Sequence, residues 1–193
     1  MKRVCIQILS LTLCLQLRAE VIDRIEAVVN GKILTSSDIR KERGLAAVFG
    51  EMPRNDERVL QDLIDRSLVE DQIAQFPNVE VTDAEVDDAS RGLTASTDLP
   101  MSDLRNTLRS RILRARYFEV RFRQFIRASD EETQTYYKDV FVPEARDRGL
   151  NPIPDFEEAV ESIRANIIDE KMTQEVQAWL ESLRRRSEVE VFN

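Results

Sequence analysis

The segment from Asp155 to Arg186 most strongly limits what this chain can fold into, because its apolar residues recur at steps of three and four. Asp155 is a good N-cap residue, and the run of arginines at 184–186 stands where cations favour a helix C-terminus. At 1.5 Å per residue such a helix is roughly 48 Å long and needs a partner along much of its length. The segment therefore predicts a helical protein built around one long helix.

Capping signals and apolar periodicity predict further helices upstream. Thr82 to Glu85 and Ser129 to Glu132 are capping boxes, in which side-chain oxygens satisfy free amides at a helix start. After Pro100 the apolar positions again advance by three and four, and this stripe predicts that Phe118, Phe122 and Phe125 are core residues. A binding groove formed by these three rings is the less favoured alternative. We expect these helices over about 35–50, 55–76, 82–93, 100–127 and from 129 through Tyr136, Tyr137 and Phe141.

The two ends of the chain after residue 20 carry strand signals. Residues 21–29 are rich in β-branched side chains and precede Asn30-Gly31, the dipeptide best suited to a type I′ hairpin turn. Valine and glutamate alternate over residues 188–191, which indicates a final strand. Since an isolated hairpin is too small to be stable, we expect 20–35 and 188–192 to form one sheet. The predicted fold class is mainly α with a small antiparallel sheet.

The first 19 residues have the pattern of a secretory signal peptide. A cationic start, Met1 to Arg3, precedes an uncharged apolar stretch from Val4 to Leu17 that is too short to span a bilayer. We expect cleavage after Ala19 and no integral membrane segment afterwards. A buried N-terminal helix and lipidation at Cys14 are the less favoured alternatives. Cleavage would also remove Cys5 and Cys14, both cysteines of the chain, and with them any disulfide or thiolate site.

Composition excludes several classes of function. The chain has no histidine, which removes the commonest general base and zinc ligand, and its formal net charge of −8 would repel nucleic acid. Loss of residues 1–19 removes three basic residues and no acidic one, which takes the net charge to −11. We therefore predict no nucleic-acid partner, no catalytic residue, no metal site and no cofactor.

Clusters of charge have a structural interpretation that outweighs a chemical one. The acidic clusters at 80–88, 130–132 and 155–158 lie at predicted helix starts, where carboxylates favour the positive end of the helix dipole. None has the spacing of a calcium loop. The arginines between residues 105 and 123 suggest either binding of phosphate or lipid head groups or a solvated helix face. We favour the second, with some of the arginines pairing with acidic residues elsewhere.

An ordered set of segments resembles the SurA family of periplasmic chaperones for outer-membrane proteins. The set comprises Val21 to Thr35, Ser37-Asp38, the Leu60 to Val69 helix, Ser129 to Glu132 with Tyr136-Tyr137, Leu183-Arg184 and Val189 to Val191. The likeness spans essentially the whole chain after the signal peptide, although no single motif is unique. It implies a multi-helix, SurA/trigger-factor-like chaperone core in the periplasm.

One departure from the family pattern concerns catalysis. In the family, one or more parvulin-type prolyl isomerase domains usually precede the last helix, but residues 142–155 are too few for a globular domain. We therefore expect a chaperone core, 20–193, without isomerase activity. Within it, 20–149 holds the hairpin and helices, 150–154 is a short linker in place of the isomerase domain, and 155–193 is the long helix and closing strand.

The expected function is a holdase that binds unfolded outer-membrane proteins or other apolar polypeptide segments, near the outer-membrane assembly machinery. Large adaptable side chains near element ends are the candidate client-binding residues: Phe49, Met52, Met101, Tyr136, Tyr137 and Phe141. One alternative is a cell-envelope adaptor for a single partner, which a single stoichiometric complex would indicate. The other is a protein with residual isomerase activity, which an assay on an X-Pro peptide would detect.

Overall fold

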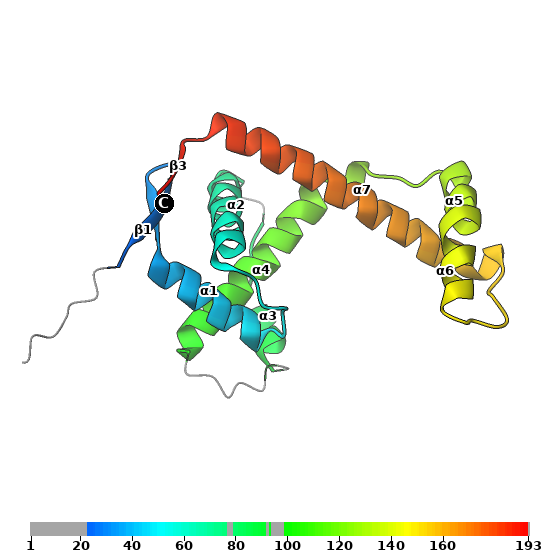
Figure 1. The fold of residues 1–193 in the computed structure, drawn as a ribbon, viewed down its shortest axis with the longest axis horizontal. Helices are drawn as coiled ribbons and strands as arrows, with labels where there is room; N and C mark the ends of the chain where they lie inside the picture. Colours follow the sequence, from blue (N-terminus) through cyan, green and yellow to red (C-terminus); the bar gives the residue numbers. More distant parts are fainter. Residues whose placement is uncertain (1–22, 77–78, 92, 94–98, 193) are drawn as a thin grey trace, which may run out of the picture.

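The protein consists of two lobes joined by one long helix, α7 (Phe156–Arg186), as Figure 1 shows. The structure is a computed structural model and describes residues 23–76, 79–91, 93 and 99–192. The predicted signal peptide and both cysteines lie outside the described residues. The larger lobe contains the sheet and helices α1 to α4, and the smaller lobe contains residues 130–147 and the first half of α7.

The two chain ends form one antiparallel sheet, as the sequence predicts. Strand β1 (Ile25–Val29) lies between β2 (Lys32–Thr35) and β3 (Val189–Val191). Positive φ angles of 48° at Asn30 and 82° at Gly31 match the type I′ turn that this dipeptide favours. The amide of Asn30 also donates to the Glu188 carbonyl at 2.8 Å, which attaches the hairpin to the chain end.

Four helices complete the larger lobe: α1 (Ser36–Val48), α2 (Asp56–Ala74), α3 (Asp83–Ser90) and α4 (Met101–Arg121). Of these, α1 and α2 pack against the sheet, and α3 packs against α4. Their starts confirm the sequence signals. Thr35 and Asp38 form a capping box on α1, Asn55 caps α2, and Thr82 forms a capping box on α3. These local hydrogen bonds satisfy free amides at the starts of α1, α2 and α3, so these three helices begin where the sequence places them. Helix α4 begins after Pro100 without a side-chain cap.

The core of the larger lobe unites the sheet, α1, α2 and the end of α7. Ala27 and Val29 of β1 pack with one face of α2 and with Leu183 of α7. A second cluster joins Tyr117 of α4 to Trp179 of α7 and to residues of α2. The C-terminal part of α7 is therefore part of the core of the larger lobe.

Helix α4 departs from its predicted extent and buried face. It ends at Arg121 and a 3₁₀ turn follows (Arg123–Phe125), so Phe125 is 76% exposed and its prediction as a core residue is wrong. Tyr117, outside the predicted stripe, is 1% exposed instead. Tyr117 lies about two and a half turns from Leu108, so the two point to opposite sides of the helix. Because α4 packs against both α3 and α2, no single stripe describes its buried residues.

The smaller lobe is one continuous helical segment packed against α7. Helix α5 (Asp130–Tyr136), a π-helical turn (Tyr137–Phe141) and α6 (Val142–Asp147) follow each other without a break. They cover a stripe on α7 whose buried members are Ala159, Ile163 and Ile167. Between residues 168 and 178, α7 has no buried residue, so the two lobes cover its ends and leave its middle open. Among the described residues, no helix combines the length and apolarity required to cross a membrane.

Removal of Glu188 to Asn193 should lower the melting temperature by about 5–10 °C, the result of losing about 2–3 kcal/mol. The deletion removes the backbone pairing of β3 with β1 and the contact of Val189 with the core. Thermal melts followed by circular dichroism measure the effect. The matched control is Glu190→Ala, which keeps the backbone hydrogen bonds and changes only an exposed side chain. An unchanged melting temperature in the truncated protein would contradict the role assigned to β3.

Candidate functional site

The open middle of α7 forms one wall of a groove against α2 and the end of α4, with a volume of about 830 Å³. We call it the α7 groove. Its apolar lining comes from Met172, Val176 and Leu180 of α7 and from Phe118 of α4, all partly buried. The three α7 residues are spaced by four, which places them on one face of the helix. The arrangement thus leaves a continuous apolar strip accessible.

Charged side chains border the α7 groove in pairs. Arg123 donates to the Asp169 carboxylate at 2.7 Å, and this hydrogen bond raises the pKa of the arginine. Arg184 donates to Asp65, which connects α7 to α2 at the other end of the groove. The pairs hold the two walls together and leave the border polar, while the strip between them stays apolar.

Beneath the α7 groove lies a cluster of aromatic rings that fixes the position of α7 on the larger lobe. The Trp179 ring contacts those of Tyr117, Phe118 and Phe122 at centroid distances of 6.1, 6.2 and 5.6 Å. The Arg121 guanidinium lies 5.1 Å from the Trp179 ring centroid, within the range of a cation–π contact. These contacts therefore hold the α7 wall of the groove against the end of α4.

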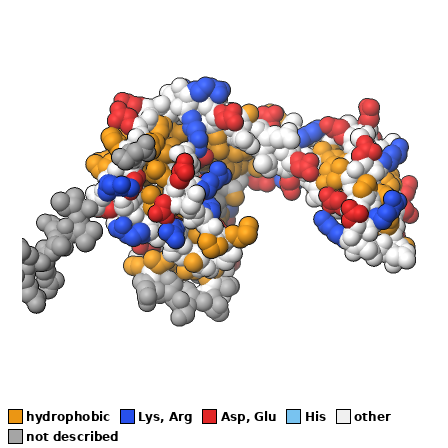
Figure 2. Space-filling view, viewed as in Figure 1, with side chains coloured by type: hydrophobic (Ala, Val, Ile, Leu, Met, Phe, Trp, Pro, Cys, Tyr) orange, Lys and Arg blue, Asp and Glu red, His pale blue; other side chains and the backbone are white. Residues whose placement is uncertain are grey.

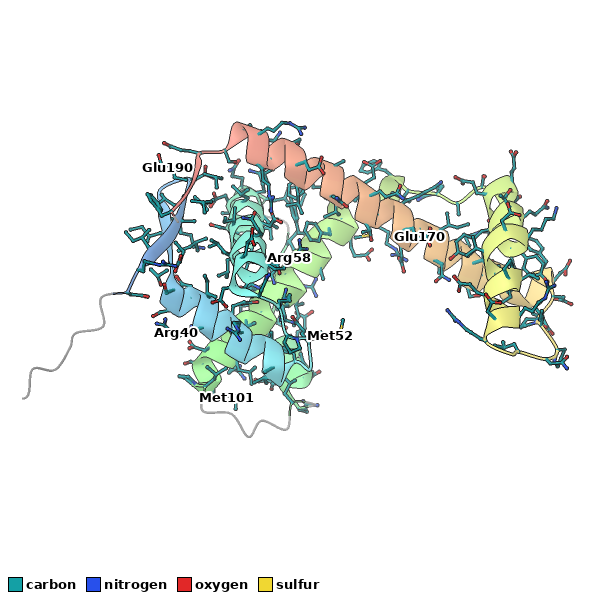
Figure 3. The ribbon with its side chains drawn as sticks, viewed as in Figure 1. Arg40, Met52, Arg58, Met101, Glu170 and Glu190 are labelled. Atoms are coloured by element: carbon teal, nitrogen blue, oxygen red, sulfur yellow. The ribbon has the colours of Figure 1, made fainter. Side chains whose placement is uncertain are left out.

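Three of the six predicted binding residues lie on the larger lobe. Met52 and Met101 are 85% and 59% exposed, and Figure 3 shows both away from the sheet. Phe49 is partly buried, with the Arg111 guanidinium 3.9 Å above its ring centroid. In Figure 2 hydrophobic side chains lie at the surface of both lobes, among charged ones.

The other three predicted residues lie together in the smaller lobe. Tyr137 stacks on Phe141 at a centroid distance of 5.7 Å, and its hydroxyl donates to the Pro154 carbonyl at 3.0 Å. The Tyr136 hydroxyl donates to Glu170 of α7 at 3.2 Å. All three rings are partly buried against α7, so they attach the smaller lobe to this helix. Any role in binding stays a prediction.

Sequence reasoning identified the apolar face of α7 but not the α7 groove. It assumed a partner along much of the helix, whereas Met172 and Val176 lie between the two lobes and have none that buries them. It also missed the exposure of Phe125. The available signal was the length of α7. The segments next to it in the sequence are short, so few of their residues are available to cover its middle.

The charged clusters act in capping and pairing. Glu85 and Glu132 complete the capping boxes of α3 and α5, as expected. A hydrogen bond from Arg116 lowers the pKa of Glu85 to about 2, and a hydrogen bond from Lys171 lowers that of Glu132 to about 2.

Most arginines between residues 105 and 123 pair with acidic residues outside α4: Arg105 with Asp87, Arg109 with Asp83, Arg111 with Glu51, Arg116 with Glu85 and Arg123 with Asp169. The run thus connects α4 to its neighbours.

Comparison with known proteins confirms the resemblance to SurA-like chaperones in sequence. No protein-family model matches the chain. A Chaperone SurA of Legionella pneumophila strain Paris is 26% identical over 138 residues, 67% of this chain and 32% of that protein. The Chaperone SurA of strain Lens is 27% identical over 131 residues, 64% of this chain and 30% of its own length. The chain therefore spans about a third of the length of these relatives.

Comparison with solved structures confirms the fold. A structure from work on the virulence factor PEB4 and the periplasmic protein Cj1289 of Campylobacter jejuni, described as two structurally related SurA-like chaperones, matches with a TM-score of 0.56. The match covers 88% of this chain and 99% of the other, at 11% sequence identity. The mainly helical architecture with its small antiparallel sheet is thus the fold of a SurA-like chaperone.

Proposed function

We propose that this protein is a periplasmic holdase that binds unfolded outer-membrane proteins in transit, without isomerase activity. The observation that carries the proposal is the α7 groove, an accessible apolar strip between charged borders on a SurA-like fold. Holding an unfolded chain requires an apolar surface that clients of many sequences can use, together with enough charge to keep the complex in solution. The groove offers the first, and the strongly acidic composition offers the second.

The dimensions of the α7 groove suit a short extended segment. Met172 and Leu180 are separated by about 12 Å along the helix axis, a distance that roughly four residues of an extended chain span. Outer-membrane strands alternate apolar and polar residues, so a segment of this length brings two apolar side chains to the strip. The flexible thioether of Met172 adapts to side chains of different shape. We therefore expect broad, weak recognition of barrel strands.

The six predicted residues extend this proposal beyond the α7 groove. Met52 and Met101 offer exposed thioethers as additional contacts on the larger lobe. The partly buried Phe49, Tyr136, Tyr137 and Phe141 offer only the exposed parts of their rings. Clients long enough to reach both lobes would contact several of these sites at once, which increases the overall affinity.

The absence of isomerase activity and the periplasmic location are further parts of the proposal. Helix α6 ends at Asp147 and α7 begins at Phe156, so the residues between them form a connection shorter than any catalytic domain. The signal peptide predicted at 1–19 supports export, and a position near the outer-membrane assembly machinery follows from the expected clients. An X-Pro peptide should therefore isomerise at the same rate with and without the protein.

Replacement of Met172 and Val176 by serine should weaken client binding roughly tenfold while the melting temperature changes little. Each side chain is partly buried in the free protein, so only its remaining exposed part is covered by a client. This contributes less than full burial of a side chain, which is worth about 1.5–3 kcal/mol. Light scattering of a diluted, urea-unfolded outer-membrane barrel protein measures protection from aggregation. The control replaces Glu175 and Ala178, both exposed and outside the groove, by serine.

The outcomes of this experiment test the α7 groove as the binding site and the holdase function separately. Full protection by the folded groove variant would remove the α7 groove from the binding site. No protection by the unaltered protein against any barrel client would refute the holdase proposal itself. Cross-linking in the intact envelope adds a test of breadth, since a single stoichiometric partner would indicate an adaptor.

A further inference from the structure

The sheet of the larger lobe has two outer edges, both apart from the α7 groove. Among the described strands, β1 lies between β2 and β3, so β2 and β3 each have one edge that pairs with no strand. The unpaired N–H and C=O groups on such an edge are a template for an added strand. The two edges differ in how many of these groups are available.

On β3, the residues whose backbone groups face away from β1 are Val189 and Val191. The Phe192 amide donates to the Glu26 carbonyl at the start of the β1 pairing, at 2.9 Å. In an antiparallel pair every second residue forms hydrogen bonds to the neighbouring strand. Glu190 therefore bonds to β1 as Phe192 does, whereas the N–H and C=O groups of the two valines point outward. Among the described residues, no backbone group outside the sheet bonds to either valine.

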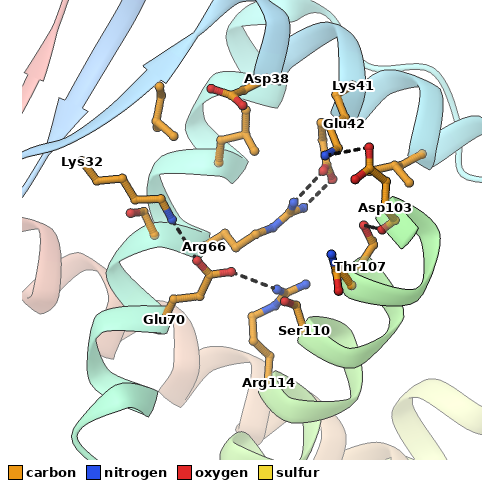
Figure 4. Close-up of a pocket in the computed structure, with 15 residues that line it drawn as sticks. Lys32, Asp38, Lys41, Glu42, Arg66, Glu70, Asp103, Thr107, Ser110 and Arg114 are labelled. Carbon is orange, nitrogen blue, oxygen red and sulfur yellow. Dashed lines mark hydrogen bonds and ion pairs between the residues drawn. The ribbon is translucent and has the colours of Figure 1, made fainter. Parts of the chain in front are cut away.

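The outer edge of β2 offers less. The Thr35 amide donates to the Asp38 carboxylate in the capping box of α1, at 2.8 Å. Lys32 reaches from β2 to Glu70 of α2, as Figure 4 shows. By the same alternation, Ile33 is left as the one residue, of the four described in β2, whose N–H and C=O are both free. The β3 edge is therefore the better template.

A groove of about 790 Å³ lies at the end of β3. Its lining combines Val191, Phe192 and Leu60 of α2 with charged side chains of α1 and α2. Val191 and Phe192 are 46% and 45% exposed, so this end of the sheet is uncovered. Val191 lies opposite the buried Ala27, which places its side chain on the sheet face that packs against α2. An apolar side chain added beside Val191 would therefore point toward this groove.

The other face of β3 is acidic. Glu188 and Glu190 are exposed and share this face, and neither takes part in an ion pair among the described residues. Residues directly opposite on paired strands have Cβ atoms about 4.5–5.5 Å apart, so a lysine or arginine opposite Glu190 is favoured. Two copies of β3 paired about Glu190 would place like charges together, which argues against a second copy of this chain.

We propose that an extended segment of an unfolded client adds to the free edge of β3 as a fourth, antiparallel strand. Apolar client residues lie opposite Val189 and Val191, and a basic residue lies opposite Glu190. Main-chain hydrogen bonds supply affinity and the alternating side chains supply selectivity. Barrel strands alternate apolar and polar residues in this way. The client origin of the segment rests on the proposed holdase function, whereas the pairing rests on the geometry and charge of the edge.

Titration of the ¹⁵N-labelled protein with an end-capped heptapeptide that alternates valine and lysine tests the pairing. We expect the largest amide shifts, and slower hydrogen exchange, at Val189 and Val191. N-methylation of the peptide's valines removes the donors that face β3 and should weaken binding more than about tenfold. The matched control is N-methylation of the peptide's lysines, whose amides point away from β3, and it should leave the affinity nearly unchanged.

Glu190→Lys tests the preference for a basic residue. This variant should bind the lysine peptide roughly three- to tenfold more weakly and should favour a peptide that alternates valine and glutamate. Glu175→Lys changes the net charge by the same amount at an exposed position in the middle of α7, and it should keep the preference for lysine. Equal losses in the two variants would reduce the effect to general attraction between charges and overturn the proposal.

Val191→Pro relates the edge to client protection. The proline removes an N–H that faces away from β1, so the sheet should remain intact. Several-fold more of this variant should be needed to protect a urea-unfolded barrel protein from aggregation. If the variant folds poorly, the peptide comparison still decides, because it uses the unaltered protein.

The remaining outcomes distinguish the edge from the holdase function. Equal binding of the unmodified and valine-methylated peptides, or amide shifts confined to the α7 groove, would overturn the β3 site even where the protein protects barrel clients. Pairing of the peptide with β3, without protection of any barrel client, would instead refute the holdase function and leave the pairing established. A dimer that dissociates as the peptide binds would assign the edge to a second copy and overturn the client assignment.

Discussion

Replacement of Glu42 by alanine should lower the free energy of unfolding by about 3–5 kcal/mol, because it leaves the Arg66 guanidinium without its partner in the interior. Glu42 is 3% exposed and the Arg66 side chain 22% exposed. Burial alone would raise the pKa of Glu42, but the hydrogen bonds and charge of Arg66 outweigh it and the pKa is lowered. The pair connects α1 to α2, and urea denaturation measures its loss.

Two variants show whether the loss arises from an unpaired buried charge. Glu42→Leu combined with Arg66→Met replaces the whole pair with apolar side chains, and much of the stability should return. Glu161→Ala removes one partner of an exposed pair with Arg164 and should cost less than about 1 kcal/mol. A cost of similar size in Glu42→Ala and Glu161→Ala would contradict the assignment of the Glu42–Arg66 pair to the interior.

Replacement of Tyr117 by alanine should cost about 3–5 kcal/mol, the range for truncating a buried aromatic side chain. Tyr117 is 1% exposed and its ring contacts those of Phe76 and Trp179 at centroid distances of 5.7 and 6.1 Å. The variant leaves a cavity where α2, α4 and α7 meet. Chemical denaturation should show the loss, and the tryptophan fluorescence should change because Trp179 loses a neighbour.

Phe125→Ala is the matched control for Tyr117→Ala. The apolar stripe of the sequence assigns Phe125 to the core, whereas in the structure Phe125 is 76% exposed. Its truncation should change the free energy of unfolding by no more than about 0.5 kcal/mol. If Phe125→Ala cost more than Tyr117→Ala, the sequence stripe would be right and the structural assignment of the α4 core wrong.

The sequence predicts the elements well because their signals are local. The Thr82–Glu85 and Ser129–Glu132 capping boxes and the Asn30-Gly31 turn each involve a few neighbouring residues, and the structure forms all three. A cap or a turn is stabilised by groups within one turn of chain, whatever the rest of the fold does. The pairing of the hairpin with β3 was also predictable, since neither is stable alone.

The α7 groove was harder to predict, because it forms where no other element covers the middle of α7. The face of α7 bearing Met172 and Val176 has the same periodicity as the part of α7 that the smaller lobe covers at Ile163 and Ile167. Periodicity reports which residues share a face, but not whether another element lies against that face.

The sequence alone determined the local structure of this protein: where its helices begin, the turn at Asn30-Gly31 and the uninterrupted length of α7. The tertiary structure decided which side of each helix is buried, because that depends on neighbours distant in sequence. It buried Tyr117 and exposed Phe125, paired Glu42 with Arg66, and left the middle of α7 accessible between two lobes. Local hydrogen bonds fix the first group, and long-range packing of side chains fixes the second.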